Sequence, residues 1–235
     1  MIKSIKIKPD TFESEILLFK EINKLKKINV LFGGNGVGKT TFLQGILKNN
    51  LILSKTKKVP KCNIVMYQNS INNARKNDPN PMMNSERYAK ELISKVHAIN
   101  ISEGQSIVYS ILNYLSEINI YLKENTEESL VVLLDEIDSG LSVDHINLIF
   151  SMIIDLSEMY DNLQFFISTN SYHFVYIVKN VLSMYTGEWI DIESYKEYFE
   201  LLNSERTKLY NCREKGFLDN APEINILKYQ LNKQK

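Results

Sequence analysis

Residues 33–40, GGNGVGKT, carry groups that could bind a phosphate chain. They fit the pattern G-x-x-x-x-G-K-[ST] in full, and glycines let successive backbone N–H groups curl around a phosphate without Cβ clashes. Lys39 can supply a mobile charge to the β- and γ-phosphate oxygens, and the Thr40 hydroxyl is suited to ligate Mg²⁺. The alternative is a glycine-rich turn that only links two elements, and the full match disfavours it. We therefore predict a nucleoside triphosphate site.

A pair of acids ends the apolar run LVVLLDE at residues 130–136. Asp135 ends a predicted buried strand, where its carboxylate can reach the water shell of Mg²⁺ beside Thr40. Glu136 leaves the strand one residue later and can act as a general base toward a hydrolytic water. Alone, such a pair could equally have no special role; beside the phosphate loop, it indicates hydrolysis.

Hydrophobic periodicity predicts the elements that must position these groups. The run INVLF (28–32) reads as a buried strand that stops at the glycines, and TTFLQGILKNN (40–50) continues as a helix. Because strands alternate with helices, we expect an α/β fold with a mostly parallel central sheet. Other expected elements are an edge strand at 4–10, strands at 63–68 and 163–169, a loop at 69–84, and helices at 86–99, 107–118, 145–159 and 174–184.

Composition bounds the class of protein. The chain has 235 residues, 44% of them hydrophobic and 24% charged, which suits one large α/β domain or two small ones. Cys62 and Cys212 stand alone, without neighbours at metal-ligand spacing. This disfavours a disulfide framework or a zinc site and fits a reducing cytosol. No apolar run is long enough to span a bilayer, so we expect a cytoplasmic protein without a transmembrane segment.

Charge is unevenly distributed along the chain. Residues 1–61 hold 13 lysines and four acids, a net charge of +9, although the whole chain is neutral. A solvated lysine-rich face is the favoured interpretation, and a patch that attracts nucleic acid or phosphate is the alternative. Aromatic residues do not interleave regularly with these lysines, so base stacking is not indicated.

With these residues placed, the chain resembles the ATP-binding cassette (ABC-type) ATPases. GGNGVGKTT (33–41) looks like the Walker A motif of that family, and LVVLLDEIDSGLS (130–142) looks like its Walker B motif joined to its D-loop. The resemblance implies ATP and Mg²⁺ as ligands, with Asp135 on the metal, Glu136 as the catalytic base and Ser139–Leu141 at a dimer interface. The implied nucleotide-binding residues are Asn35, Gly36, Val37, Gly38, Lys39, Thr40 and Thr41.

The segment ISEGQ (101–105) resembles the family signature LSGGQ, with isoleucine for leucine and Glu103 for the first glycine. The resemblance implies that this segment contacts the ATP bound by a partner subunit. The residues concerned are Ser102, Glu103, Gly104 and Gln105. The alternative is that Ser102 only caps a helix. The Glu103 carboxylate should weaken ATP-driven closure if it points inward; outward, it is an ordinary acid of a first helical turn.

Two further residues follow from the resemblance. Gln68, after the strand NIVMY, is the candidate for the family glutamine that senses the metal and the γ-phosphate; the alternative is a surface glutamine. The family usually has a histidine where STNSYHF places Asn170. Asparagine can donate a hydrogen bond but carries no proton or positive charge. We therefore predict slow hydrolysis, in a clamp or timer, and a structural role for His173.

The resemblance covers about residues 1–185 and implies the domain organisation. We expect an ABC-type P-loop NTPase domain at 1–190, with an N-terminal antiparallel β portion and a reduced helical subdomain at about 69–123. A helical C-terminal extension at 191–235 would pack on this domain or dock a partner. Phe12 is the weak candidate for stacking on adenine.

Three functions remain open from the sequence. The first is a slow ATPase that forms an ATP-dependent homodimer and controls a protein effector or a nucleic-acid process, for example in antiphage defence or a mobile element. The alternative is the cytosolic ATP-binding subunit of a membrane transporter, against which the small helical region and Asn170 weigh. The third is a nucleotide sensor with negligible turnover, against which Glu136 weighs.

Overall fold

The computed structural model describes residues 1–235 except 10, 12, 14–15, 56–61, 73–101 and 205–235. The chain divides into two compact units, Met1–Glu193 and Ser194–Lys235. Of the second unit, the structure describes 194–204, and residues 195–204 are helical. Several expectations lie outside the described residues. They are the helix at 86–99, most of the loop at 69–84, Phe12, Ile101, Cys212 and the rest of the C-terminal extension.

A six-stranded sheet forms the centre of the first unit, in the order β5-β6-β7-β3-β8-β9. Its first five strands are parallel and β9 is antiparallel to β8, so the expected α/β class with a mostly parallel sheet is confirmed. The strands are β5 (Cys62–Gln68), β6 (Ser129–Asp135), β7 (Leu163–Ser168), β3 (Ile28–Phe32), β8 (Asn180–Ser183) and β9 (Trp189–Asp191). Strand β7 therefore separates the strand before the phosphate loop from the strand that ends in the acid pair.

A smaller antiparallel sheet is formed by two strands that precede the phosphate loop in the chain and one strand that follows it. Its strands are β1 (Ile2–Ile7), β2 (Glu21–Ile22) and β4 (Leu51–Lys55), in the order β2-β1-β4. The expected N-terminal antiparallel β portion is thus confirmed. Helix α2 (Lys39–Leu47) packs against β4 of this sheet and against the central sheet. Phe42 is fully buried, and its ring contacts Phe19, which precedes β2, and Phe166 of β7. This packing fixes the helix that the phosphate loop opens.

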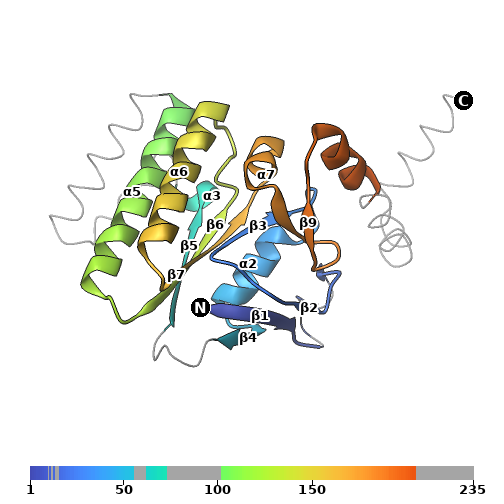
Figure 1. Ribbon diagram of the computed structural model, residues 1–235, viewed down its shortest axis with the longest axis horizontal. Coiled ribbons are helices and arrows are strands. Elements are labelled where there is room, and N and C mark those ends of the chain that lie inside the picture. Colours follow the sequence, from blue (N-terminus) through green and yellow to red (C-terminus); the bar gives the residue numbers. More distant parts are fainter. Residues whose placement is uncertain (10, 12, 14–15, 56–61, 73–101, 205–235) are drawn as a thin grey trace, which may run out of the picture. The chain divides into compact units, whose positions relative to one another are not determined.

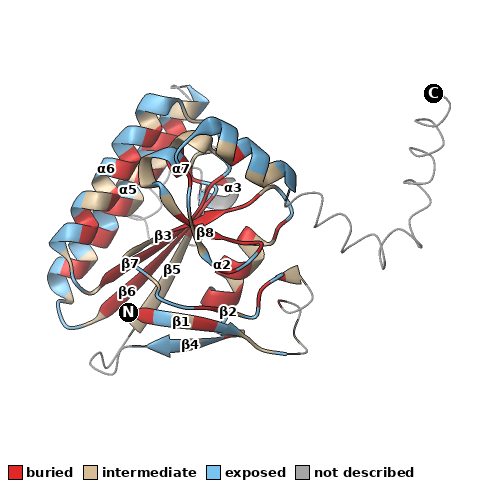
Figure 2. Cartoon of the chain, turned by 45° about the vertical axis from the view of Figure 1, so that its right-hand side comes forward, coloured by how far each residue is buried: buried red, intermediate tan, exposed pale blue. Residues whose placement is uncertain are grey.

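Two long helices cover the other side of the central sheet. Helices α5 (Glu103–Glu124) and α6 (Val143–Met159) lie side by side there, away from α2 (Figure 1). Each helix has a buried apolar face, although Ile120 of α5 and Leu148 and Met159 of α6 are exposed. Strands β6 and β7 are buried along their whole length (Figure 2). The acid pair and the residues after β7 therefore emerge from a rigid core.

Three expected elements differ from the structure. The strand expected at an edge, at 4–10, is β1 (Ile2–Ile7), which lies between β2 and β4. The run 174–184 is not one helix: α7 (Tyr172–Val178) ends at Lys179, which has a φ of +60°, and β8 follows. The apolar residues after Lys179 pair with β3 instead, with Leu182 opposite Leu31. The segment expected to begin as a loop at residue 69 begins with a short helix, α3 (Asn69–Asn72). Short apolar runs fit either a helix or a strand, and the sheet decides between them.

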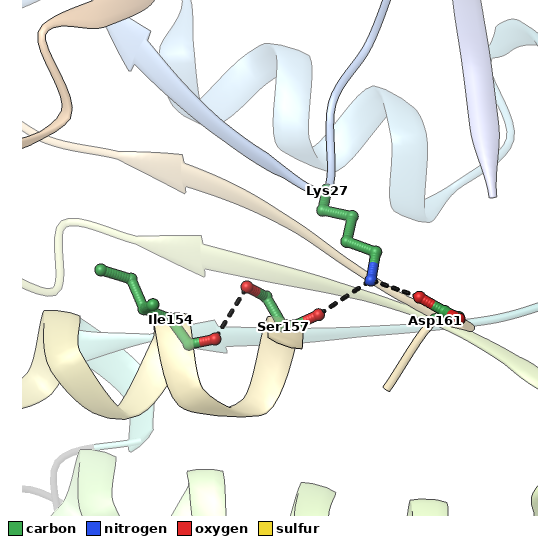
Figure 3. A network of polar contacts seen from close by, with 4 residues as sticks. All are labelled: Lys27, Ile154, Ser157 and Asp161. Carbon is green, nitrogen blue, oxygen red and sulfur yellow. Dashed lines mark hydrogen bonds and ion pairs between the residues drawn. The ribbon is translucent and has the colours of Figure 1, made fainter. Parts of the chain in front are cut away.

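Several lysines of the basic N-terminal region make contacts within the chain. The Lys27 Nζ donates to the Ser157 carbonyl oxygen at 3.0 Å and to Asp161 at 2.6 Å (Figure 3), and this contact lowers the pKa of Asp161. Lys6 pairs with Glu21, and Lys26 lies over the Trp189 ring. Lys8 donates to the Asn49 carbonyl oxygen. These four lysines therefore contact other groups of the same chain, and their presence does not require a nucleic-acid ligand. Among the described helices, none has the length and apolarity to cross a membrane.

Candidate nucleotide site

The phosphate loop connects β3 to α2 and requires glycine at two positions. A Cβ atom at Gly33 would lie 2.7 Å from the Val37 side chain, and one at Gly38 would lie 2.9 Å from Leu17. Gly38 also has a φ of +99°, which side-chain-bearing residues rarely adopt. The Tyr185 hydroxyl accepts a hydrogen bond from the Gly34 N–H at 2.8 Å and so fixes the start of the loop.

The other predicted nucleotide-binding residues of this loop differ in exposure. Asn35 and Gly36 are exposed, Val37 is fully buried beneath the loop, and Thr41 is half-buried in the first turn of α2. Exposed backbone beside the N-terminus of a helix, where N–H groups have no partner within the helix, is a suitable place for an anion.

Lys39 is buried within the loop. Its Nζ donates to the carbonyl oxygens of Gly33 at 2.6 Å and Gly34 at 3.1 Å, and to Asn170 Oδ1 at 2.8 Å. Burial lowers the pKa of Lys39 to about 8, although the carboxylates of Glu136, Asp138 and Asp135 act in the opposite direction. At neutral pH the lysine is therefore still mostly charged.

Asp135 connects the residues predicted to bind the metal. It ends β6 and is only 5% exposed. Its Oδ1 accepts from the Thr40 hydroxyl at 3.0 Å, and its Oδ2 accepts from Gln68 Nε2 at 3.1 Å. The structure thus brings together Thr40, Gln68 and Asp135, which are far apart in sequence.

Ser168 is a member of this cluster that sequence reasoning missed. It ends β7, is fully buried, and donates from Oγ to Asp135 Oδ1 at 2.6 Å. The same Oγ accepts from the Glu136 backbone N–H at 2.9 Å. The polar end of the apolar run LQFFIS was the available signal. Its use required knowing that β7 lies next to β6.

The donor set of this cluster fits Mg²⁺. The described residues contain no group of three or more His, Cys, Asp or Glu side chains that could hold a metal ion. Mg²⁺ does not need such a group, since it usually binds through one or two carboxylates together with waters and phosphate oxygens. The hydroxyl of Thr40, the carboxylate of Asp135 and the amide oxygen of Gln68 are hard ligands of this type.

Glu136 differs from Asp135 in both exposure and backbone conformation. It is exposed and has a φ of +52°, although it is not glycine. This left-handed conformation costs a side-chain-bearing residue about 1 kcal/mol. It turns the chain away directly after the strand, so that one acid is buried and the next is exposed.

Asn170 follows β7 and contacts both the lysine and a third acid. Its side-chain oxygen accepts from Lys39, and its backbone N–H donates to Asp138 Oδ2 at 3.0 Å. His173 lies elsewhere, with Nε2 at 2.9 Å from Asn147 Oδ1 of α6. The residue at the position of the family histidine is therefore part of the cluster around Lys39.

The segment 102–105 forms the N-terminus of α5. Ser102 Oγ accepts from the Gln105 N–H at 3.3 Å, and Gln105 Oε1 accepts from the Ser102 N–H at 3.1 Å, which is a capping box. A Cβ atom at Gly104 would lie 3.2 Å from the Gly140 carbonyl oxygen. Ser102, Glu103 and Gln105 are exposed. In the described part of the chain, these residues make no hydrogen bond to the cluster around Lys39.

Comparison with known proteins gives matches in structure only. No protein-family model matches the chain, and no curated protein matches its sequence. A bacterial ABC transporter cassette solved as a dimer is 16% identical, covers 83% of this chain and 100% of its own, and has a TM-score of 0.49. The CbiO1 protein of Clostridium perfringens, part of an ABC transporter complex, is 16% identical, covers 97% and 100%, and has a TM-score of 0.46.

A third match is an inward-facing metal-chelate type ABC transporter, 20% identical over 86% of this chain and 89% of its own, with a TM-score of 0.48. This chain is similar to ABC-type ATP-binding cassettes. At such identities and TM-scores, the matches carry no argument about activity, ligands or partners, so the roles of the site residues rest on the geometry above.

Proposed function

We propose that the chain is an ABC-type ATPase that binds ATP with Mg²⁺, hydrolyses it slowly and acts as an ATP-switched dimer. The observation that carries this proposal is the cluster at Asp135, where the carboxylate bonds to Thr40, Gln68 and Ser168 beside the buried Lys39. The same edge of the sheet presents the exposed Glu136. A phosphate loop, a metal-binding acid and an exposed base are the parts that hydrolysis of a triphosphate needs.

Binding of ATP would use the exposed backbone of the loop. The N–H groups at 35–38 and the N-terminus of α2 attract the β-phosphate, and Lys39 adds its charge to the β- and γ-phosphate oxygens. Thr40, Asp135 and Gln68 would hold Mg²⁺, which neutralises charge on these phosphates when it is bound. Lys39 would exchange its contact with Asn170 Oδ1 for a phosphate oxygen.

Hydrolysis would use Glu136 as the general base. Its carboxylate takes a proton from a water whose oxygen forms a bond to the γ-phosphorus, while the bond from that phosphorus to the β–γ bridging oxygen breaks and ADP leaves. Asn170 can orient groups by hydrogen bonds but cannot carry a proton or a positive charge. Turnover should therefore be slow, as in a clamp or timer.

A second copy of the chain would complete the site. Ser102, Glu103 and Gln105 are exposed and lie at a helix N-terminus, which attracts phosphate. In the proposed dimer, Ser102 and Gly104 contact the γ-phosphate bound by the other copy, and Ser139–Leu141 crosses between the copies. Closure and release would then control a protein effector or a nucleic-acid process in the cytoplasm.

Isothermal titration of ATP with Mg²⁺ tests the binding step. Lys39→Ala should weaken ATP binding at least about tenfold, because a charge-assisted hydrogen bond contributes about 1.5–3 kcal/mol. Asp144→Asn, at an exposed acid in the first turn of α6, is the matched control and should bind like the wild type. A wild type that does not bind ATP, or a Lys39→Ala variant that binds equally well, would contradict the proposal.

A further inference from the structure

Asp138 lies between the acid pair and the segment Ser139–Leu141, and the site described so far gives it no role. It is half-buried, and its Oδ2 accepts two hydrogen bonds from the loop after β7. The donors are the Thr169 hydroxyl at 2.8 Å and the Asn170 backbone N–H at 3.0 Å. One carboxylate oxygen therefore joins the loop after β6 to the loop after β7.

The two strands that precede these loops are joined as well, at their last residues. Ser168 Oγ donates to Asp135 Oδ1 and accepts from the Glu136 N–H. Beyond this point, the loop after β6 folds on itself, since the Ser139 N–H donates to the Glu136 carbonyl oxygen and the Leu141 N–H to that of Asp138. Movement of Asp138 would therefore move Ser139–Leu141 as well.

The two attachments differ in what they fix. Ser168 fixes the buried metal-binding acid and the backbone of Glu136. Asp138 fixes the backbone of Asn170, whose side-chain oxygen is 2.8 Å from Lys39 Nζ. Three hydrogen bonds therefore connect Lys39 to Ser139–Leu141. They join Lys39 to Asn170, Asn170 to Asp138, and Leu141 to Asp138.

We infer that Asp138 is a positioning residue, which places Asn170 at the phosphate site and couples that site to Ser139–Leu141. The inference rests on the proposed ATPase function. It assigns to Asp138 no contact with ATP and no proton transfer. The carboxylate of Asp138 also raises the pKa of Lys39, but its positioning role is to accept two hydrogen bonds, which a neutral acceptor of the same shape can accept as well.

Two substitutions of Asp138 distinguish the effect of losing the hydrogen-bond acceptor from the effect of losing the negative charge. Asp138→Ala removes the acceptor. Asp138→Asn can keep it and places the amide nitrogen at Oδ1, which is buried and accepts no hydrogen bond among the described residues. Asp138→Ala should lower kcat for ATP at least about tenfold with KM within about threefold, because the loss concerns alignment in the transition state rather than binding.

Asp138→Asn should stay within about threefold of the wild type, as should the exposed-acid control Asp144→Asn. Three results would overturn the inference. They are an Asp138→Ala variant with wild-type kcat, an Asp138→Asn variant as impaired as Asp138→Ala, and parallel loss of kcat and binding in Asp138→Ala.

Hydrogen exchange of the Asn170 amide tests the contact without any activity. In nucleotide-free protein, this amide should exchange at least about tenfold faster in Asp138→Ala than in the wild type, while the amides of β3 are unchanged. Unchanged exchange at Asn170 would overturn the inference even in a working ATPase. Faster exchange together with a wild type that does not hydrolyse ATP would overturn the proposed function and leave the contact established.

Discussion

The phosphate loop with Asp135 and the N-terminus of α5 both present groups suited to phosphate, but they are built differently. In the first region, Lys39 and Asp135 are buried and bonded to residues at or just after the ends of several strands. In the second region, Ser102 and Gln105 are exposed, and in the described part of the chain their side chains bond only within the capping box. The first region is assembled by the fold of one chain, whereas in the proposed dimer the second region acquires its ligand from the other copy.

This difference follows from where each region lies in the fold. The carboxyl ends of parallel strands meet at one edge of a sheet, so β3, β5, β6 and β7 can bring their side chains to one place. A helix N-terminus at the surface offers unpaired N–H groups and a partial positive charge without such convergence. Variants in the first region should therefore change ATP binding or catalysis directly, and variants in the second should act through the association of two copies.

The largest effect is expected at Glu136. Glu136→Gln should lower turnover about 10²- to 10⁴-fold, the range typical for loss of a general base, and should keep ATP affinity within several-fold. Glu136→Gly should lose turnover equally and gain about 1 kcal/mol of unfolding free energy from relief of the left-handed conformation. Single-turnover hydrolysis and chemical denaturation measure these effects. Equal turnover in the wild type and Glu136→Gln would support a nucleotide sensor instead.

The next largest effect is a pH dependence from Lys39. Because the pKa of Lys39 is lowered to about 8, the side chain loses its charge above that pH, and ATP affinity should fall up to about tenfold per pH unit there. Between pH 8 and 10.5 the unfolded chain binds more protons at this residue than the folded chain. Its contribution to the unfolding free energy therefore rises with pH in that window.

Titration calorimetry of ATP at pH 7, 8 and 9 checks this dependence. Lys39→Arg keeps a charge throughout and should show a flat profile, whatever its absolute affinity. Ser102→Ala, in the other region, should retain the wild-type profile. A flat profile in the wild type would contradict the role of the buried lysine.

The residues of the site that lie in motifs could be predicted from the sequence, and those whose role depends on strand order could not. Thr40 and Asp135 were predicted from their motifs, and Gln68 was predicted from the family resemblance and its place after a strand. Ser168 could not be found, since its role depends on β7 lying between β3 and β6. The contact of Tyr185 with the phosphate loop was not predicted, because the residues before it were expected to be helical. They form β8 instead, which pairs with β3 and places Tyr185 beside the loop. Strand order is a long-range property that local patterns do not contain.

A smaller effect is expected at Tyr185, which supports the first region from outside the motifs. Tyr185→Phe removes the acceptor for the Gly34 N–H, so the unfolding free energy should fall by about 1 kcal/mol and ATP affinity severalfold. Tyr176→Phe, at an exposed tyrosine of α7, is the matched control and should change neither quantity. Chemical denaturation and ATP titration measure the two quantities. Equal unfolding free energy and equal ATP affinity in the two variants would show that Tyr185 does not support the site.

The smallest effect is expected at Glu103, in the second region. The residue is exposed in the first turn of α5, where an acid is favourable and glycine is not. Glu103→Gly should cost about 1 kcal/mol of unfolding free energy and change ATP-dependent association less than about threefold. Sedimentation velocity with ATP measures the association. A strong gain in association would show that the carboxylate opposes the incoming phosphate.

The mass of Glu136→Gln in solution, measured by light scattering with and without ATP and Mg²⁺, tests most directly whether a second copy completes the site. The variant should bind ATP and hydrolyse it too slowly to release it. We predict a monomer without nucleotide and a dimer with ATP, which Ser102→Ala in the same background should weaken. A monomer under both conditions, with ATP bound, would contradict the account.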